Sequence, residues 1–219
     1  IKKPIPVYLM NSFSTEEETY RYLTERKYFE RKEIQILCFS QSISIRLTGD
    51  QQIYKNKDGH PSFYAPGHGD FIESFKRSGM LDDFLSRQGK VLFLSNVDNI
   101  MADPDPVIIG YHLESQATVT CEIVEKIADD RGGTPLLVGG IIQIMEDFRL
   151  PEKFDRSMVP IFNTNTFTLS ESALQKEYNL TWFYVEKLLS KGEEPIVQCE
   201  QLIGEITAFN KTQYLSVPR

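Results

Sequence analysis

The chain has 219 residues, with 24 basic and 31 acidic side chains, so its formal net charge is -7 at pH 7. Hydrophobic residues make up 41% and charged residues 25% of the sequence, which supports a packed core and excludes intrinsic disorder as the main state. The excess of acidic residues argues against nucleic-acid and anionic-membrane partners, because both bind to positively charged protein surfaces. No stretch approaches the roughly 18 apolar residues of a membrane span.

Three cysteines, Cys38, Cys121 and Cys199, stand in apolar, strand-like contexts rather than at metal-ligand spacing. An odd count in such contexts predicts buried free thiols in a reducing compartment, so we expect a cytoplasmic protein. The sequence opens at Ile1, directly before a strand-like run, and we expect its natural start to lie upstream.

The first part of the chain alternates strand-like and helix-like segments. Residues 4–10 are apolar and β-prone. The next segment, from Ser12, combines cap residues, three glutamates and apolar residues at helical spacing. Residues 34–39 predict a second strand, which Gln41 follows directly. Residues 49–66 are polar and contain Gly and Pro, which predicts a loop or short hairpin.

Residues 70–88 predict two short helices, because Ser78 and Gly79 interrupt the apolar spacing. Residues 91–94 form a continuous apolar run, typical of a strand buried on both faces of a parallel sheet. Residues 118–124 predict another strand.

The last part of the chain predicts a hairpin, a strand and a helix. The hairpin turns at Gly139 and Gly140. Residues 158–162 lead into Asn163–Asn165, and Ser170 is expected to cap a helix that continues to about residue 189.

Alternating strands and helices predict an α/β fold, a mixed and mainly parallel sheet with helices on both faces. In such sheets ligands bind beyond the carboxyl ends of the strands. That rule selects residues 10–11, 41, 67–70, 96–99 and 163–165. Asn, Gly and Asp also follow strands because turns need them, so each segment alone has an ordinary structural interpretation.

Several short segments form a constellation when taken in order. They are LMNSF (9–13), FSQS (39–42), PGHGD (66–70), SNVDN (95–99), EK (125–126), GGT (132–134), ME (145–146), FNTN (162–165) and QCE (198–200). Their order and spacing resemble the UDP-glucose pyrophosphorylase family, the UTP:glucose-1-phosphate uridylyltransferases, over essentially the whole chain. PGHGD, SNVDN and FNTN are the specific part.

The resemblance implies that residues 1–219 are part of a catalytic nucleotidyltransferase domain with a nucleotide-binding, Rossmann-like sheet. It implies an enzyme that makes UDP-glucose and pyrophosphate from UTP and glucose 1-phosphate under Mg²⁺. The family's phosphate loop precedes LMNSF and its lysine follows the VPR segment, so both fall outside this sequence. We therefore expect the 219 residues alone to be inactive. The oligomeric state stays open.

Two of the segments would contact the nucleotide. Gln41 carries an amide donor and a carbonyl acceptor, which suit the hydrogen-bonding edge of uracil. The resemblance implies that Gln41 and Met10 bind the nucleotide part of the substrate. By resemblance Gly67 contacts the uracil and His68 is a catalytic residue that reaches the sugar phosphate. Gly67 and Gly69 would let the backbone approach a ligand closely. A loop-capping glutamine and an ordinary turn histidine are the alternatives.

Asp98 is the predicted metal ligand and a predicted catalytic residue. A carboxylate at the end of a buried strand is the hard oxygen ligand that Mg²⁺ takes together with substrate phosphates. By resemblance Asn96 and Asp98 belong to the ribose, metal and phosphate region. The alternative for Asp98 is an Asx turn.

Four further residues resemble those that line the sugar side of the family's site. They are Gly133, Glu146, Asn163 and Asn165. Amides and a carboxylate suit the hydroxyls of glucose, which carries no charge. Alternatively, Gly133 belongs to a hairpin turn and Glu146 is a solvated strand residue.

The sequence departs from the family pattern at some positions, which leaves rival functions open. Ala65 replaces a second proline, Thr166 follows FNTN, and residues 100–106 differ from the usual segment. One rival is a UDP-N-acetylhexosamine or broad UDP-sugar pyrophosphorylase. The other is a non-catalytic relative that binds a nucleotide sugar.

Overall fold

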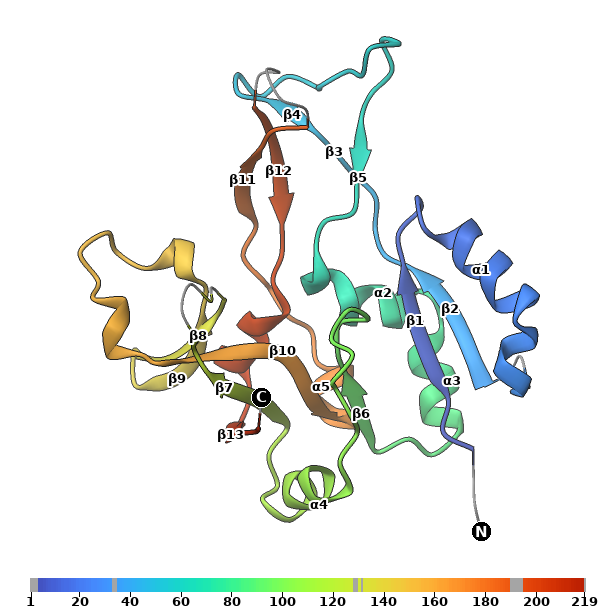
Figure 1. Cartoon of the computed structure of the whole chain (residues 1–219), viewed down its shortest axis with the longest axis vertical. Coiled ribbons are helices and arrows are strands. Elements are labelled where there is room, and N and C mark those ends of the chain that lie inside the picture. Colours follow the sequence, from blue (N-terminus) through green and yellow to red (C-terminus); the bar gives the residue numbers. More distant parts are fainter. Residues whose placement is uncertain (1–3, 33–34, 128–129, 131, 190–194, 219) are drawn as a thin grey trace. The chain divides into compact units, whose positions relative to one another are not determined.

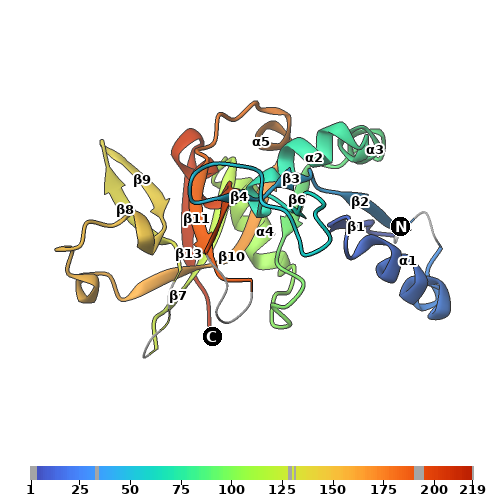
Figure 2. The same ribbon diagram turned by 90° about the horizontal axis from the view of Figure 1, so that it is seen from above.

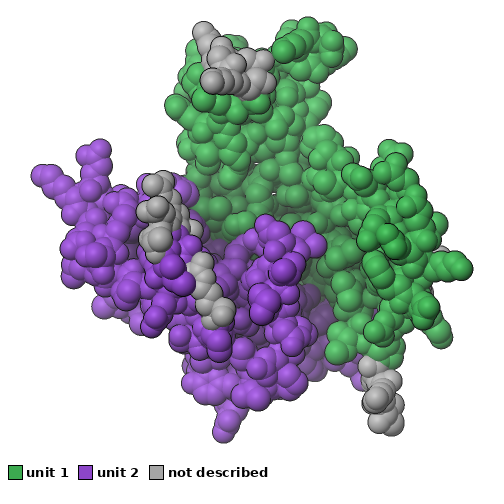
Figure 3. All heavy atoms as spheres, in the orientation of Figure 1, with its two compact units in different colours: residues 1–83, 180–203 green, residues 84–179, 204–219 purple. Residues whose placement is uncertain are grey.

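The computed structural model describes residues 4–32, 35–127, 130, 132–189 and 195–218. Two compact units make up the chain, one from Ile1–Asp83 with Leu180–Ile203 and the other from Phe84–Asn179 with Gly204–Arg219 (Figure 3). They are called unit 1 and unit 2. In the described part, no helix combines the length and the apolar character that crossing a bilayer requires.

Unit 1 is built on a strand–helix–strand motif. Strand β1 (Val7–Asn11) leads through α1 (Glu16–Glu25) to β2 (Ile36–Ser40), and the two strands pair in parallel. Helix α1 covers one face of this pair and α2 (Phe71–Arg77) the other (Figures 1 and 2). These elements are as predicted, except that residue 34, the expected start of the second strand, lies outside the described residues.

The core between β2 and α2 is aromatic. Phe39 lies within 6.0 Å of Phe71 and 5.6 Å of Phe75, measured between ring centroids, and all three side chains are buried. Tyr8 of β1 meets Phe75 edge-on at 5.1 Å. Edge and stacked ring pairs of this kind add to the stabilisation from burial alone.

The remaining strands of unit 1 are short and antiparallel. Strand β3 (Ser44–Ile45) pairs with β5 (Phe63–Tyr64), and β12 (Ile196–Glu200) lies between β11 (Phe183–Lys187) and β4 (Leu47–Thr48). The predicted loop or hairpin at residues 49–66 therefore contains β5 and connects it to β4.

Unit 2 is centred on a sheet of four strands in the order β13–β7–β10–β6. Their bounds are Thr212–Ser216 (β13), Val119–Glu125 (β7), Ile161–Ser170 (β10) and Val91–Leu94 (β6). Strand β13 runs parallel to β7, whereas β10 is antiparallel to both of its neighbours. Six of the seven residues of β7 are buried, so the core of unit 2 lies around this strand.

The hairpin of β8 (Thr134–Val138) and β9 (Ile141–Met145) turns where the sequence predicts. Gly139 and Gly140 have φ of 59° and 84°, which a two-residue type I′ turn requires at both central positions. The predicted helix break is also confirmed, because Gly79 (φ 80°) separates α2 from α3 (Met80–Ser86).

A mainly parallel sheet is not confirmed, and the fold is a mixed α/β arrangement of small sheets. Strand β6, predicted to be buried within a parallel sheet, instead stands at the edge and pairs antiparallel with β10. A short apolar run fixes neither the direction nor the position of a strand, because both depend on which distant segment pairs with it.

The helix predicted after Ser170 begins where expected, with Ser170 at the N-cap position but without a side-chain cap bond, and its predicted extent to about residue 189 is wrong. Helix α5 spans only Glu171–Gln175, and Lys176 already has extended backbone with ψ 142°. Most of the side chains of β11 alternate between half-buried and exposed, a period of two that suits pairing with β12.

Helix α4 (Pro106–Glu114) was not predicted although its start is clearly signalled. The Asp105 carboxylate accepts from the backbone N–H of Val107 at 2.7 Å, and proline occupies the first helical position. The short 3-10 helices are Lys27–Glu30, His68–Asp70, Asp147–Arg149, Arg156–Met158 and Ile203–Phe209.

Each cysteine lies in a strand and is a free thiol, as predicted. Cys121 of β7 is fully buried, whereas Cys38 of β2 and Cys199 of β12 are only partly so.

Candidate active site

Met10 and Gln41 stand at the carboxyl ends of the paired strands β1 and β2 in unit 1. Met10 stands opposite Phe39 in the parallel register, and the backbone N–H of Gln41 donates to the carbonyl of Asn11 at 2.9 Å. The side-chain oxygen of Gln41 is buried and has no hydrogen-bond partner among the described residues. Buried acceptors are normally paired, so this oxygen is a candidate acceptor for a donor from a ligand or a water molecule.

The glycines of the PGHGD segment pack against the chain's own backbone. A Cβ at Gly69 would lie 2.4 Å from the carbonyl carbon of Gln201, and one at Gly67 would lie 2.9 Å from its oxygen. Gly69 N–H donates to the Gln201 carbonyl, and Gln201 N–H donates to the Pro66 carbonyl, both at 2.9 Å. The close approach expected toward a ligand is therefore made, in the described chain, by residues 201–202.

His68 is held as a neutral imidazole of one tautomer. Its Nδ1 accepts from the backbone N–H of Ile203 at 3.1 Å. Burial lowers the pKa of His68, while nearby Glu200 opposes this shift and raises it. With Nδ1 accepting, the proton of the neutral ring is on Nε2, which is then a hydrogen-bond donor.

The lowered pKa of His68 predicts that unit 1 loses stability in acid. The folded-state pKa lies below the ordinary value of 6.5, so the unfolded chain binds the proton more readily. This contribution is complete above pH 6.5 and is lost as the pH falls through the folded-state pKa. Urea unfolding at pH 8 and pH 5 measures it. The His68→Gln variant should show a smaller pH dependence, and an unchanged dependence would contradict the assignment.

A cavity of about 620 Å³ adjoins the PGHGD segment in unit 1. Tyr64, Ala65 and Glu200 line it. The other lining residues are Phe13, Ser14, Arg46, Phe63, Lys187, Leu188, Leu189 and Gln198. Met10, Gln41, Gly67 and His68 do not line it.

In unit 2 the loop after β6 is joined to the middle of β10. Asn165 Nδ2 donates to Asn96 Oδ1 at 2.8 Å, and Asn99 Nδ2 donates to Thr166 Oγ1 at 3.2 Å. The pairing of β10 with β7 shifts register between Asn163 and Phe167, and Asn165 has φ of 59°. The asparagines predicted to follow a strand therefore lie within one, at a bulge that re-aims their side chains.

Asn163 is oriented by three hydrogen bonds. Its Oδ1 accepts from Asn165 N–H at 2.8 Å and from the thiol of Cys121 at 3.2 Å, and its own N–H donates to the Gly133 carbonyl at 2.7 Å. Burial raises the pKa of Cys121 well above the usual value, so the thiol keeps its proton and can donate. The two bonds to Oδ1 leave the amino group as the part of the Asn163 side chain that could donate to a ligand.

Two glycines make room for the carboxyl group of Glu146. A Cβ at Gly133 would lie 2.7 Å from Glu146 Oε1 and 2.4 Å from Cγ2 of Ile144, and one at Gly204 would lie 2.8 Å from the same Cγ2. Burial raises the pKa of Glu146; Asp147 and Glu205 also raise it, whereas Arg149 lowers it. Glu146 is thus partly enclosed rather than a solvated strand residue.

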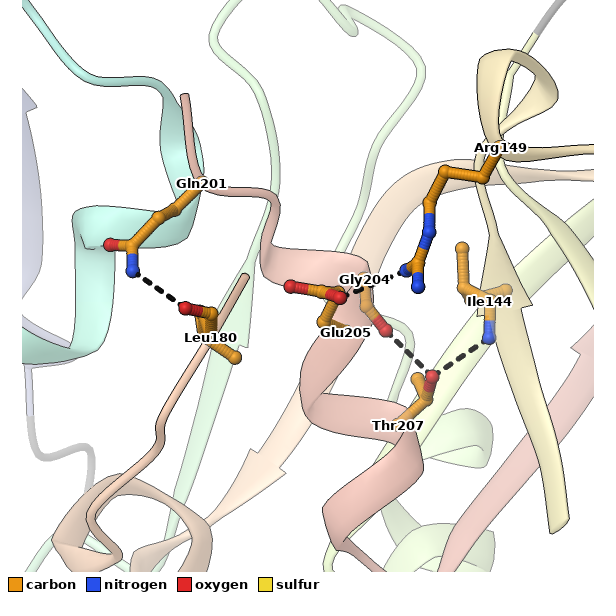
Figure 4. A network of polar contacts seen from close by, with 7 residues as sticks. All are labelled: Ile144, Arg149, Leu180, Gln201, Gly204, Glu205 and Thr207. Atoms are coloured by element: carbon orange, nitrogen blue, oxygen red, sulfur yellow. Dashed lines mark hydrogen bonds and ion pairs between the residues drawn. The ribbon is translucent and has the colours of Figure 1, made fainter. Parts of the chain in front are cut away.

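Polar contacts join β9 and the connection that follows it to the segment from Gly204 to Thr207 (Figure 4). Arg149 forms an ion pair with Glu205 at 2.9 Å. Thr207 Oγ1 accepts from the N–H of Ile144 at 2.9 Å and donates to the Gly204 carbonyl at 2.6 Å. Figure 4 also shows Gln201 of unit 1 donating to the Leu180 carbonyl at 3.1 Å.

Asp98 is an exposed carboxylate on the loop after β6. Its carbonyl accepts from Ile100 N–H at 3.0 Å, and Asn99 N–H donates to the Asn96 carbonyl at 3.2 Å. Within the described residues, no three His, Cys, Asp or Glu side chains gather as a metal site. A single carboxylate suits Mg²⁺ of the kind that is held mainly by substrate phosphates and water.

The predicted site residues thus fall into two groups. Unit 1 holds Met10, Gln41, Gly67 and His68; unit 2 holds Asn96, Asp98, Gly133, Glu146, Asn163 and Asn165. Within unit 2, hydrogen bonds join Asn96 to Asn165 and Asn163 to Gly133, and Gly133 adjoins Glu146. Cys121, predicted only to be a buried thiol, and Gly204 and Arg149 were not predicted to belong to the site, because their contacts here join segments distant in the chain.

Comparisons with known proteins identify the family of this chain. A family profile described as UTP–glucose-1-phosphate uridylyltransferase matches residues 1–219. A relative of that name from Pyrus pyrifolia is 29% identical over 98% of this chain and 48% of its own length, so the chain spans about half of the curated relatives it matches.

Two solved structures share the fold. A putative UDP-N-acetylglucosamine pyrophosphorylase from Entamoeba histolytica has a TM-score of 0.86 at 24% identity, covering 100% of this chain and 60% of that one. A mutant of UDP-glucose pyrophosphorylase from Leishmania major, in complex with UDP-glucose, has a TM-score of 0.77 at 21% identity, covering 97% and 52%.

Proposed function

The chain belongs to the UTP–glucose-1-phosphate uridylyltransferase family, and on that premise we propose that it forms part of an enzyme that makes UDP-glucose and pyrophosphate from UTP and glucose 1-phosphate. The observation that carries the proposal is the family match over all 219 residues. The free thiols of Cys38, Cys121 and Cys199 support a cytoplasmic setting for this reaction.

The reaction needs positioning more than covalent chemistry. A phosphate oxygen of glucose 1-phosphate attacks the α-phosphorus of UTP, and the bond from that phosphorus to the pyrophosphate oxygen breaks. The nucleophile is already an anion, so no general base is required. The protein therefore acts by aligning the two substrates and by stabilising charge on the phosphoryl oxygens.

The residues of unit 1 suit the nucleotide. The unpaired Gln41 oxygen is an acceptor for the ring N–H of uracil, and the Gln41 amide is a donor for the neighbouring uracil carbonyl. The Nε2–H of neutral His68 is a donor for a phosphate oxygen of the sugar phosphate. Met10, at the end of β1, offers an apolar contact to the base.

The residues of unit 2 suit the sugar and the phosphates. The amide groups of Asn163 and Asn165 and the Glu146 carboxylate can hydrogen-bond glucose hydroxyls. Asn96, bonded to Asn165, connects this group to the loop that carries Asp98. Asp98 is the residue that would hold Mg²⁺, which supplies positive charge to the phosphates when bound.

Pyrophosphate release with a panel of sugar 1-phosphates tests the function. UTP and Mg²⁺ are supplied to the polypeptide translated from the whole reading frame and, separately, to the 219 residues. Glucose 1-phosphate should give the highest rate. A higher rate with N-acetylglucosamine 1-phosphate than with glucose 1-phosphate would favour the UDP-N-acetylhexosamine alternative. UDP-glucose binding without turnover in the whole product would favour the non-catalytic one.

The Cys121 thiol is expected to contribute to UDP-glucose affinity through Asn163. Cys121→Ala removes the donor to Asn163 Oδ1 and should weaken UDP-glucose binding about fivefold. This factor corresponds to the roughly 1 kcal/mol that one hydrogen bond contributes. Cys121→Ser keeps a donor and should bind more tightly than the alanine variant. Calorimetric titration gives both affinities, and thermal melting controls for the stability of the core. Equal affinities for both variants would show that the hydrogen bond has no effect.

A further inference from the structure

We propose that Asp70 is a positioning residue for base selection, which holds the Gln41 loop against the PGHGD segment without touching the nucleotide. The proposal rests on the proposed function, because it concerns the same uracil edge. It gives a role to Asp70, which the sequence placed in the PGHGD segment at the start of a helix without assigning it a contact.

Asp70 is buried, with 5% of its surface exposed, and its carboxylate accepts three hydrogen bonds from donors in two segments. Oδ2 accepts from Ser42 N–H at 2.6 Å and from Ser74 Oγ at 2.5 Å, while Oδ1 accepts from Ser42 Oγ at 3.0 Å. An ionised carboxylate accepts all three bonds at once, and such charge-assisted bonds are stronger than neutral ones.

Arg77 fixes the direction of both hydroxyl groups. Its NH1 donates to Ser42 Oγ at 2.9 Å and its NH2 donates to Ser74 Oγ at 3.0 Å. Each serine oxygen therefore accepts from Arg77 and directs its own proton to Asp70. The four side chains form one network in which a change at Asp70 alters every bond.

The network connects the two segments that carry the uracil contacts. Ser42 directly follows Gln41, whose backbone is anchored on β1 through Asn11. Asp70 directly follows Gly69, which is anchored on the backbone of Gln201. Two of the three bonds to the carboxylate come from Ser42, so Asp70 sets how the Gln41 loop lies relative to Gly67.

The contacts of Asp70 differ from those of a helix cap. Asp70 occupies the N-cap position of α2, yet its side chain accepts no bond from the helix backbone. A capping aspartate would accept from an amide in the first turn of its own helix. Removing the Asp70 charge should therefore loosen residues 41–42 more than it affects the start of α2.

Asp70→Asn tests the proposal in the 219-residue chain, because the amide keeps the shape and loses the charge. Hydrogen exchange should become at least about tenfold faster at the Ser42 amide, while the amides of α2 keep their protection. The UTP-over-CTP affinity ratio, measured by calorimetric titration, should fall about tenfold. Asp82→Asn, an exposed aspartate on α3, is the matched control and should change neither measurement.

A second variant keeps the test decisive if Asp70→Asn does not fold. Ser42→Ala leaves the carboxylate and its bonds to Ser42 N–H and Ser74, and should give a smaller fall in the same ratio. Unchanged exchange at Ser42 with an unchanged ratio would overturn the positioning role, even if the melting temperature falls. A wild-type chain without preference for UTP would contradict the uracil role of Gln41 on which the base-selection part rests, whereas faster exchange at Ser42 in the variant would still show that Asp70 holds the Gln41 loop.

Discussion

Asp98→Asn is expected to lower turnover about a hundredfold or more in the polypeptide translated from the whole reading frame, while UDP-glucose affinity stays within about threefold. The proposed role of Asp98 is to hold Mg²⁺, whose charge matters most as negative charge develops on the phosphoryl oxygens. A contact that strengthens in the transition state affects the chemical step more than ground-state binding. The asparagine keeps the shape of the side chain and loses the charge.

The measurement is the rate of pyrophosphate release as a function of Mg²⁺ concentration, with UDP-glucose affinity from calorimetry. Asp103→Asn is the matched control, because Asp103 is an exposed aspartate of the same connection between β6 and α4. It should leave the rate near that of the wild type. If Asp98→Asn kept wild-type turnover at every Mg²⁺ concentration, the metal role would be wrong and the Asx-turn alternative would stand.

Gln41→Ala is expected to reduce the preference for UTP over CTP by about a hundredfold, with little change in affinity for glucose 1-phosphate. Uracil presents a carbonyl beside a ring N–H, whereas cytosine presents an amino group beside a bare nitrogen. A buried amide left unpaired by the wrong base discriminates strongly, and alanine removes that penalty.

The structure sharpens this test against the alternative of a loop-capping glutamine. The backbone of Gln41, not its side chain, makes the bond to Asn11, and the side-chain oxygen is buried without a partner among the described residues. Alanine should therefore leave the melting temperature nearly unchanged. Gln52→Ala, an exposed loop position, controls for the loss of a glutamine side chain. A lowered melting temperature with unchanged base preference would support capping.

Local patterns predicted much of the fold. Strand β1, helices α1 and α2 and the Gly139–Gly140 turn follow from neighbouring residues, through side-chain period, cap residues and glycine at positive φ. The direction of β6 and the end of α5 did not follow. Both depend on pairing with segments distant in the chain: β6 with β10, and residues 183–187 with β12. Helix α4 was not predicted either, although Asp105 and Pro106 mark its start, because the residues just before it are polar and irregular.

The candidate site divides in the same way. Asn96 could be selected because it follows a predicted strand, whereas Glu146 was selected only through the resemblance to the family. Asp70, Cys121 and Gly204 could not be assigned, since each acts through a partner far along the chain. Their sequence contexts carry only ordinary signals: a helix start, a strand thiol and a glycine in a loop.

The packing of Gly69 against residues 201–202 limits how this part of the sequence can change over generations. The atoms that a side chain at position 69 would meet belong to backbone, namely the carbonyl carbon of Gln201 and the nitrogen of Leu202. Backbone atoms are the same whatever residues stand at 201 and 202, so no smaller side chain there can open space. A suppressor of a substitution at Gly69 must instead shift the path of the chain after β12. Position 69 is therefore restricted to glycine, and substitutions of the side chains at 201 and 202 do not relieve this contact.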